Sequence, residues 1–191
     1  MKKKTLSWAK PGLLLSFLLL GTVLTACNSK WQGDISNLDE GWIAHQYEII
    51  DEFEQKLEAN PEDAEALFEI AFRYQQLEDY KTAIKYYKKT LEANPDNVTV
   101  YNNLANIYET VEEYDLAAEN IMVYFQNNQT SVEAVKDAVR VLLLAGDPEN
   151  AQIALDTYAM QTSDESSPEH TQFLSDLKGQ IYDYEVAHNL K

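Results

Sequence analysis

A five-residue motif that occurs twice constrains this chain more than any other feature. The sequence Leu-Glu-Ala-Asn-Pro ends at Pro61 and again at Pro95, so the residue numbers of its two copies differ by 34. The same step connects small residues at two positions and large apolar residues at two others. The four series are Ala71, Ala105 and Val139; Tyr74, Tyr108 and Leu142; Ala83, Ala117 and Ala151; and Tyr87, Ile121 and Leu155. A fixed period of this length predicts a helical-repeat solenoid, in which each repeat packs only against its neighbours.

Between Pro61 and Pro95, two segments have a helical spacing of apolar residues, and Leu77-Glu78-Asp79 is a turn between them. The first segment carries Ala64, Leu67, Ile70, Ala71 and Tyr74, and the second carries Tyr80, Ala83, Ile84, Tyr87 and Leu91. Helices of this length are marginal alone, and one pair leaves a face uncovered, so successive pairs have to stack. The alanines fit places where two helix backbones approach closely. Pro61 suits the first turn of a helix, where a missing N–H costs nothing.

These positions resemble the tetratricopeptide repeat family over residues 61–162. The first repeat, residues 62–95, supplies Leu67, Ile70, Ala71, Tyr74, Ala83, Tyr87, Thr90 and Pro95; the second, 96–129, supplies Tyr101, Leu104, Ala105, Tyr108, Ala117, Ile121 and Tyr124; the third, 130–162, supplies Val135, Ala138, Val139, Leu142, Ala151, Leu155 and Tyr158. Gln129 and Ser163 stand where the family has proline. The resemblance implies an all-α solenoid of antiparallel helix pairs. An unrelated helical bundle is the alternative.

The segments on either side of the repeats show different patterns. Residues 42–60 have helical spacing and occupy the place of a leading helix that covers the first repeat. Residues 28–41 show little periodicity and indicate a linker. Within residues 163–191, Ser166-Ser167-Pro168 resembles the start of a C-terminal capping helix, and a degenerate fourth repeat is the alternative. Gly179 is a weak point in this helix, and the sequence does not explain it.

Residues 1–27 have the features of a bacterial lipoprotein signal peptide. Four lysines precede an apolar stretch at residues 13–24 that is too short to span a membrane as a stable helix. The stretch ends in Leu24-Thr25-Ala26-Cys27, which resembles the lipobox at which a signal peptidase cuts before a lipid-modified cysteine. Cys27 is the only cysteine, which fits an acyl acceptor and excludes an internal disulfide. An ordinary secretory signal with an incidental cysteine is the alternative.

A lipobox implies a location on the extracytoplasmic face of a bacterial membrane. Acyl chains on Cys27, at about 0.8 kcal/mol per buried methylene, would anchor the protein to the outer membrane of a Gram-negative cell or the cell membrane of a Gram-positive one. The whole chain has 15 basic and 32 acidic residues; without the four lysines of residues 1–27, eleven basic residues remain against 32 acidic ones, a net charge of −21. Such a chain lacks the basic surface that nucleic acids require. We therefore expect no nucleic-acid partner and contact with the membrane through the lipid alone.

Residues that could support catalysis are scattered along the chain. His45, His170 and His188 lie far apart, and the i, i+3 pair of His45 with Glu48 is more often a surface feature than a metal site. The sequence has no glycine-rich phosphate loop, no second cysteine and no plausible pairing of a nucleophile with a base. We expect no enzymatic activity, no metal and no cofactor apart from the lipid on Cys27.

In tetratricopeptide solenoids the concave surface is lined by the first helix of each repeat, and the resemblance implies a binding surface there. Its candidate residues are Phe68, Phe72, Gln75, Asn102, Asn106, Lys136 and Arg140, beside Glu65, Glu109 and Leu143. Aromatic, amide and cationic groups in this order suit a peptide with an apolar part and a carboxylate. The alternatives are burial of the two phenylalanines against the leading helix, and local pairing of the two cations with Glu133 and Asp137.

The favoured hypothesis is a membrane-anchored scaffold that binds a protein or peptide partner in a cell-envelope complex for assembly, secretion or cell-wall synthesis. A small-ligand or solute-binding lipoprotein is the second hypothesis. Three repeats form a shallow groove and not a closed pocket, which counts against it. A degenerate enzyme is the third.

Overall fold

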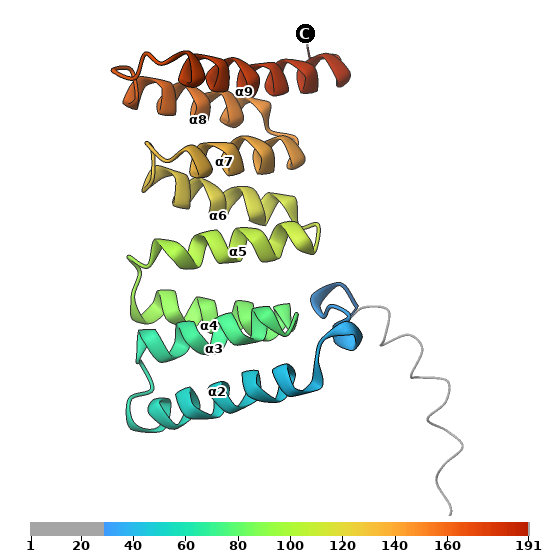
Figure 1. Cartoon of the computed structure of the whole chain (residues 1–191), viewed down its shortest axis with the longest axis vertical. Coiled ribbons are helices and arrows are strands. Elements are labelled where there is room, and N and C mark those ends of the chain that lie inside the picture. Colours follow the sequence, from blue (N-terminus) through green and yellow to red (C-terminus); the bar gives the residue numbers. More distant parts are fainter. Residues whose placement is uncertain (1–28, 191) are drawn as a thin grey trace, which may run out of the picture.

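The computed structural model describes residues 29–190, which are mostly helical (Figure 1). Two short 3-10 helices, η1 (Ser29–Trp31) and η2 (Ile35–Asn37), come first. They are followed by eight α-helices: α2 (Glu40–Ala59), α3 (Ala64–Gln76), α4 (Tyr80–Ala93), α5 (Val98–Thr110), α6 (Tyr114–Gln126), α7 (Val132–Leu144), α8 (Pro148–Gln161) and α9 (Pro168–Ala187). None of these helices is long and apolar enough to cross a membrane. The predicted signal peptide and Cys27 lie outside the described residues.

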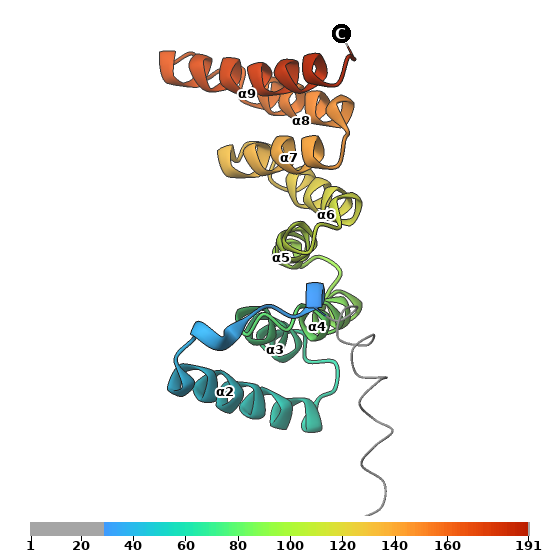
Figure 2. The same ribbon diagram turned by 90° about the vertical axis from the view of Figure 1, so that its right-hand side faces the viewer.

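The helices recur with the period of the sequence motif. Helices α3, α5 and α7 begin at residues 64, 98 and 132, while α4, α6 and α8 begin at residues 80, 114 and 148, so both series advance by the step of the motif. We call the first set helix A and the second set helix B. Each helix A packs against the helix B that follows it, and the pairs stack along the long axis of the molecule (Figures 1 and 2). The predicted all-α solenoid of antiparallel helix pairs is confirmed.

The turn from helix A to helix B has one backbone conformation in all three repeats. Glu78, Glu112 and Gly146, which are related by the same step, have φ angles of 54°, 59° and 78°. This left-handed region suits glycine and is less favourable for glutamate. In each turn the next residue donates its backbone N–H to a carbonyl oxygen near the end of helix A: Asp79 to Tyr74, Glu113 to Tyr108 and Asp147 to Leu142, at 2.9, 2.8 and 2.8 Å. These hydrogen bonds satisfy carbonyl groups that the end of the helix would leave unpaired.

The start of α3 is fixed by an aspartate and not by proline. The Asp63 carboxylate accepts hydrogen bonds from the backbone N–H groups of Glu65 and Ala66, which are otherwise unpaired in the first turn. Pro61 lies in the loop before this cap, so the prediction that it occupies the first turn of a helix is wrong. Its effect is on the preceding residue: Asn60 is extended (φ −141°, ψ 93°), as expected before proline, and α2 ends there.

The residues that repeat along the sequence form the core. Ala83, Ala117 and Ala151 of helix B are completely buried. They share one continuous hydrophobic cluster with the small residues of helix A and with the large side chains of helix B, namely Ala71, Ala105, Val139, Tyr87, Ile121 and Leu155. Because this single cluster contains residues from all three repeats, the core runs without a break from the first repeat to the third. Tyr74 is the exception among the repeated positions, because it is only half-buried.

Helix α2 covers the outer side of the first repeat by packing against α3. Its Ile50 is buried together with Ile70 of α3 and Leu77 of the first turn. The helix begins at Glu40, two residues before the start suggested by the apolar pattern, because the Asp39 side chain accepts a hydrogen bond from the Trp42 N–H (2.8 Å) and so caps the helix.

Helix α9 packs like a fourth helix A, and no helix B follows it among residues 29–190. It begins at Pro168, slightly later than the period requires, packs against both α7 and α8, and is capped by Ser167, which accepts a hydrogen bond from the His170 N–H. With this spacing, the buried residues Val135, Val139 and Leu142 of α7 correspond in α9 to three exposed polar residues, Thr171, Ser175 and Lys178. The buried residues of α9 are those that face the preceding repeat: His170, Leu177 and Ile181. The helix therefore packs as the first half of a further repeat.

The prediction of a linker at residues 28–41 is wrong for residues 30–33, which we call the strap. The Gly33 N–H donates to the Glu78 carbonyl oxygen (2.9 Å), and Gln32 forms an isolated β-bridge with Asp79. Trp31 packs against the core, and Lys30 forms an ion pair with Glu113. Figure 2 shows this segment crossing α3 between α4 and α2. The contacts are largely made by backbone groups, which leave no apolar period in the sequence.

Replacing Gly179 with alanine should raise the free energy of unfolding by about 0.5–1 kcal/mol, because glycine is unfavourable inside a helix and the site is exposed. An added Cβ would meet no atom within 4 Å. Chemical denaturation compares the variant with wild type. Gly146→Ala is the control and should lower the free energy of unfolding, since the φ of 78° at this position is unfavourable for any residue with a Cβ atom. A destabilised Gly179→Ala protein would show that this glycine has a packing role.

Candidate functional site

The candidate binding residues lie on helix A of the three repeats, and contacts between elements connect them. We use the name helix A surface for Phe68, Phe72, Gln75, Asn102, Asn106, Lys136 and Arg140 together. Tyr87 of α4 joins α3 to α5 through hydrogen bonds, an ion pair joins α5 to α7, and a surface hollow lies between α7 and α9. Contacts therefore connect the helices that carry these residues, from α3 through α5 to α7, and the hollow borders α9.

Phe68 and Phe72 form the aromatic end of this surface. Their rings are parallel, with centroids 6.4 Å apart and an interplanar angle of 4°. Phe68 also packs against Tyr87 at 5.8 Å and thereby joins the main core, so its alternative, burial against the leading helix, is wrong. Phe72 is half-buried, and the Arg73 guanidinium lies over its ring at 5.1 Å from the centroid. Phe72 consequently keeps an accessible aromatic surface next to a cation.

Gln75 is held in an internal hydrogen-bond network. The Tyr87 hydroxyl donates to Gln75 Oε1 (2.6 Å) and accepts from Asn103 Nδ2 (2.9 Å). Burial raises the pKa of Tyr87 well above the ordinary tyrosine value, which keeps the hydroxyl protonated as a donor. Sequence reasoning did not assign a role to Asn103 in this network. A ligand that used Gln75 would have to compete with Tyr87.

The two amides of α5 differ in their accessibility. Asn106 is exposed, while the Oδ1 atom of Asn102 is buried and has no hydrogen-bond partner among residues 29–190. Asn106 is therefore available to an extended peptide backbone as both donor and acceptor. Asn102 presents an unsatisfied acceptor just beneath the same surface, and a buried unpaired acceptor usually costs about 1–3 kcal/mol.

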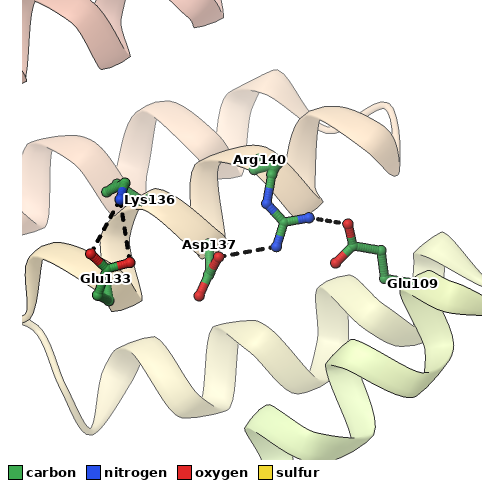
Figure 3. A network of polar contacts seen from close by, with 5 residues as sticks. All are labelled: Glu109, Glu133, Lys136, Asp137 and Arg140. Carbon is green, nitrogen blue, oxygen red and sulfur yellow. Dashed lines mark hydrogen bonds and ion pairs between the residues drawn. The ribbon is translucent and has the colours of Figure 1, made fainter.

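Lys136 and Arg140 of α7 are paired with carboxylates, as Figure 3 shows. Lys136 Nζ lies 3.2 Å from Glu133, and Arg140 donates to Asp137 at 3.0 Å and to Glu109 of α5. Partial burial alone would lower the pKa of Arg140, but the hydrogen bonds to Asp137 and Glu109 outweigh it and raise the pKa. The local pairing foreseen as the alternative is present, and Glu109 adds a bond between repeats. A ligand carboxylate would have to displace one of these acids.

A hollow of about 420 Å³ lies where Lys136 and Arg140 face α9. Its lining combines cations, carboxylates, an amide and apolar groups: Lys136, Asp137, Arg140, Phe173, Asp176, Leu177 and Gln180. Sequence reasoning missed the four residues of α9, because the strict step of 34 fails after the third repeat. A slightly larger step, set by the longer loop before α9, places Asp176 at the position of Arg140.

The three histidines are far from one another and serve local contacts. His170 is buried against Tyr158 and lies 3.2 Å from the Thr162 hydroxyl. His45 pairs with Glu48 at 3.4 Å on an exposed face of α2, and His188 stacks on Tyr184. Between residues 29 and 190, no three His, Cys, Asp or Glu side chains are grouped so that they could hold a metal ion.

Comparison with known proteins agrees with this architecture. Residues 73–111, which span the end of α3, all of α4 and α5, match the model of the TPR repeat family. The structure of the MamA RS-1 ArsTM double mutant is similar with a TM-score of 0.55 and 13% identity, over 84% of this chain and 99% of that one. A tetratricopeptide repeat protein from Parabacteroides merdae ATCC 43184 matches at a TM-score of 0.46 and 21% identity, over 78% of this chain and 55% of that one. No curated protein sequence matches the chain.

These similarities define the class of the fold. The chain is an all-α tetratricopeptide-repeat solenoid with one additional helix at each end. This chain spans about half the length of the Parabacteroides protein. At 13% identity the MamA structure supports the fold and indicates no ligand or partner.

Proposed function

We propose that this protein is a lipid-anchored scaffold that binds an extended segment of a protein partner along the helix A surface. The observation that carries the proposal is the order of accessible chemical groups on successive A helices. Phe72 presents an aromatic group at one end, Asn106 an exposed amide in the middle, and Arg140 a cation beside the hollow at the other. Grooves lined by successive helices bind peptides through this combination of apolar anchors and polar groups.

The partner is expected to offer an apolar side chain followed by a carboxylate. The apolar side chain would pack on Phe72, whose ring is already half-buried and so loses little entropy on binding. The carboxylate would replace Asp137 or Glu109 at the Arg140 guanidinium, which has enough donors to hold two acids. Such a partner fits an envelope complex for assembly, secretion or cell-wall synthesis.

A small-ligand lipoprotein is the competing proposal, and the shapes of the hollows favour the scaffold. The hollow beside Arg140 measures about 420 Å³, but it is open to solvent and flanked by charged groups. Small-molecule sites usually enclose roughly 70–90% of their ligand within mainly apolar walls. Co-purification from detergent-solubilised membranes separates the two proposals. A stoichiometric protein supports the scaffold, whereas a co-eluting metabolite without a protein supports the small-ligand function.

Cys27→Ser should abolish acylation and leave the protein as an uncleaved precursor or in the soluble fraction. The serine hydroxyl is not the thiol that the lipobox chemistry modifies. Intact-mass measurement of the wild-type and variant proteins, combined with membrane fractionation, tests the expectation. A wild-type mass that corresponds to an unmodified Cys27 would refute the lipid anchor.

Arg140→Gln should lower the affinity for a co-purified protein partner by about fivefold or more, since an important interface residue contributes over about 1 kcal/mol of binding free energy. The loss should shrink as salt rises, because the contact is between partly exposed charges. Glutamine is preferred to glutamate here, since a third acid beside Glu109 and Asp137 would destabilise the fold itself.

Phe72→Ala should weaken binding of the same partner with little dependence on salt, because its contribution would be apolar burial. Binding is measured by titration at several salt concentrations.

Lys81→Gln is the matched control for Arg140→Gln. Lys81 is an exposed cation on helix B, α4, away from the helix A surface. Its removal changes the net charge equally and should leave affinity unchanged. If Arg140→Gln and Phe72→Ala both bind the partner as tightly as wild type, with unchanged circular dichroism, the binding surface lies elsewhere.

A further inference from the structure

The strap brings the start of the described chain to one edge of the solenoid. Lys30 pairs with Glu113 in the second turn from helix A to helix B, and Gly33 bonds to Glu78 in the first such turn. We call the edge formed by these turns and the one at Gly146 the turn edge. It lies on the right in Figure 1, and the loops before α3, α5 and α7 form the opposite edge.

The strap leaves almost no spacer between this edge and Cys27. Lys30 follows Cys27 by three residues, and an extended chain covers at most about 3.3–3.6 Å per residue. The two Cα atoms can therefore be separated by roughly 11 Å at most. The spacer is thus residues 28–29, and not the whole of residues 28–41. An acylated Cys27 lies at the level of the lipid headgroups, so the second turn must lie close to that level too.

We propose that the turn edge faces the bilayer, so that the repeat helices stand along the membrane normal and the helix A surface runs parallel to the membrane plane. This inference rests on the lipid anchor proposed above. The body cannot enter the hydrocarbon, and its tether emerges at this edge. The opposite edge lies one helix length away, which for the 13 residues of α5 is about 20 Å.

The tether, and not attraction to lipid, sets this orientation. The turn edge carries the acidic residues Glu78, Asp79, Glu112 and Glu113 around the cation of Lys30. Anionic headgroups would repel such an edge over a screening length of about 8 Å at physiological salt. Zwitterionic phosphatidylcholine vesicles are therefore the appropriate probe, since they add neither attraction nor repulsion.

The test uses the processed, lipidated full-length protein in phosphatidylcholine vesicles that carry a short-range quencher on the headgroup. Acylation blocks Cys27, so a single introduced cysteine takes the fluorophore. Glu112→Cys labels the turn edge and Asp96→Cys the opposite edge of the same repeat. Both sites are exposed, both lie just beyond an end of α5, and both substitutions remove one negative charge. We expect several-fold stronger quenching at position 112 than at position 96.

Releasing the strap should abolish this difference. Lys30→Glu turns the ion pair with Glu113 into a repulsion, and Gly33→Val adds a side chain that collides with the Glu78 carboxylate. The strap lies outside the α-helices, and circular dichroism reports whether the double variant folds. Lys30→Glu alone is the milder second variant and should reduce the difference in part.

Equal quenching at positions 112 and 96 in the acylated protein overturns the proposed orientation and leaves the lipid anchor intact. An intact mass without acyl chains overturns both, because no tether then exists. Equal quenching at both positions in the released variant, with an unequal pattern in wild type, supports the strap as the element that orients the body, whereas a difference that survives release overturns that role.

Discussion

Tyr87→Ala should lower the free energy of unfolding by about 3–5 kcal/mol, the usual cost of truncating a buried aromatic residue. Tyr87 is completely buried, packs against Phe68 and belongs to the cluster that joins the first repeat to the second. Its removal leaves a cavity and also leaves Gln75 and Asn103 without their shared partner. Urea denaturation followed by circular dichroism measures the loss.

Tyr87→Phe separates packing from hydrogen bonding. It keeps the ring and should cost only about 1 kcal/mol, the net value of a typical hydrogen bond. The two proteins should also differ at high pH. Burial raises the pKa of Tyr87, so above pH ~10 the unfolded chain ionises this residue first, and stability falls as pH rises toward the folded pKa. Tyr87→Phe should show a shallower loss. Equal slopes would indicate that Tyr87 is solvated in the folded protein.

Ala105→Leu should destabilise the protein by about 1–3 kcal/mol through overpacking. Ala105 is 1% exposed on α5 and lies in the cluster shared by successive repeats, so three added carbon atoms have no space. Thr99→Leu is the control, because it makes an apolar substitution at an exposed position of the same helix and should stay within about 0.5 kcal/mol of wild type. Equal melting temperatures of the Ala105→Leu and Thr99→Leu proteins would contradict the repeat register.

The constant period of the repeats carried most of the information about the fold. Positions 83, 117 and 151 are all alanine for a simple physical reason: each is completely buried, and a larger side chain there would push two helix backbones apart. Such positions recur and can be recognised in sequence. From these positions the sequence predicts which side chains are buried, how the helices pair and that the pairs stack.

The strap could not be predicted on the same grounds. Gly33 docks through its own N–H on the carbonyl of Glu78, and nearly any residue possesses these groups. Only the lack of a side chain at Gly33 leaves a trace in the sequence, since a Cβ there would collide with the Glu78 side chain. A single glycine is not a distinctive signal, so the segment resembled a linker.

The candidate site was predicted in part. The positions on helix A were deduced from the repeat, but their partners in other repeats were not. Glu109 lies 31 residues before Arg140, and Asn103 lies 16 after Tyr87, so neither contact follows a helical spacing within one element. The contributions of Phe173 and Gln180 were hidden by the change of step before α9. These contacts depend on how repeats are rotated against one another, which the periodicity does not specify.

The three exposed polar residues of α9 have a consequence for assembly. A stack of identical units has no inherent length, and molecules with apolar ends would join head to tail into filaments. Thr171, Ser175 and Lys178 oppose such joining at α9, since burying them would strip water from three polar groups, although Tyr182 and Val186 are also exposed on this helix. Glu48, Asp51 and Glu52 are exposed on α2 at the other end. Polar and charged groups on both outer helices therefore oppose head-to-tail stacking of whole molecules, and the sides of the stack remain as surfaces through which the protein can join others.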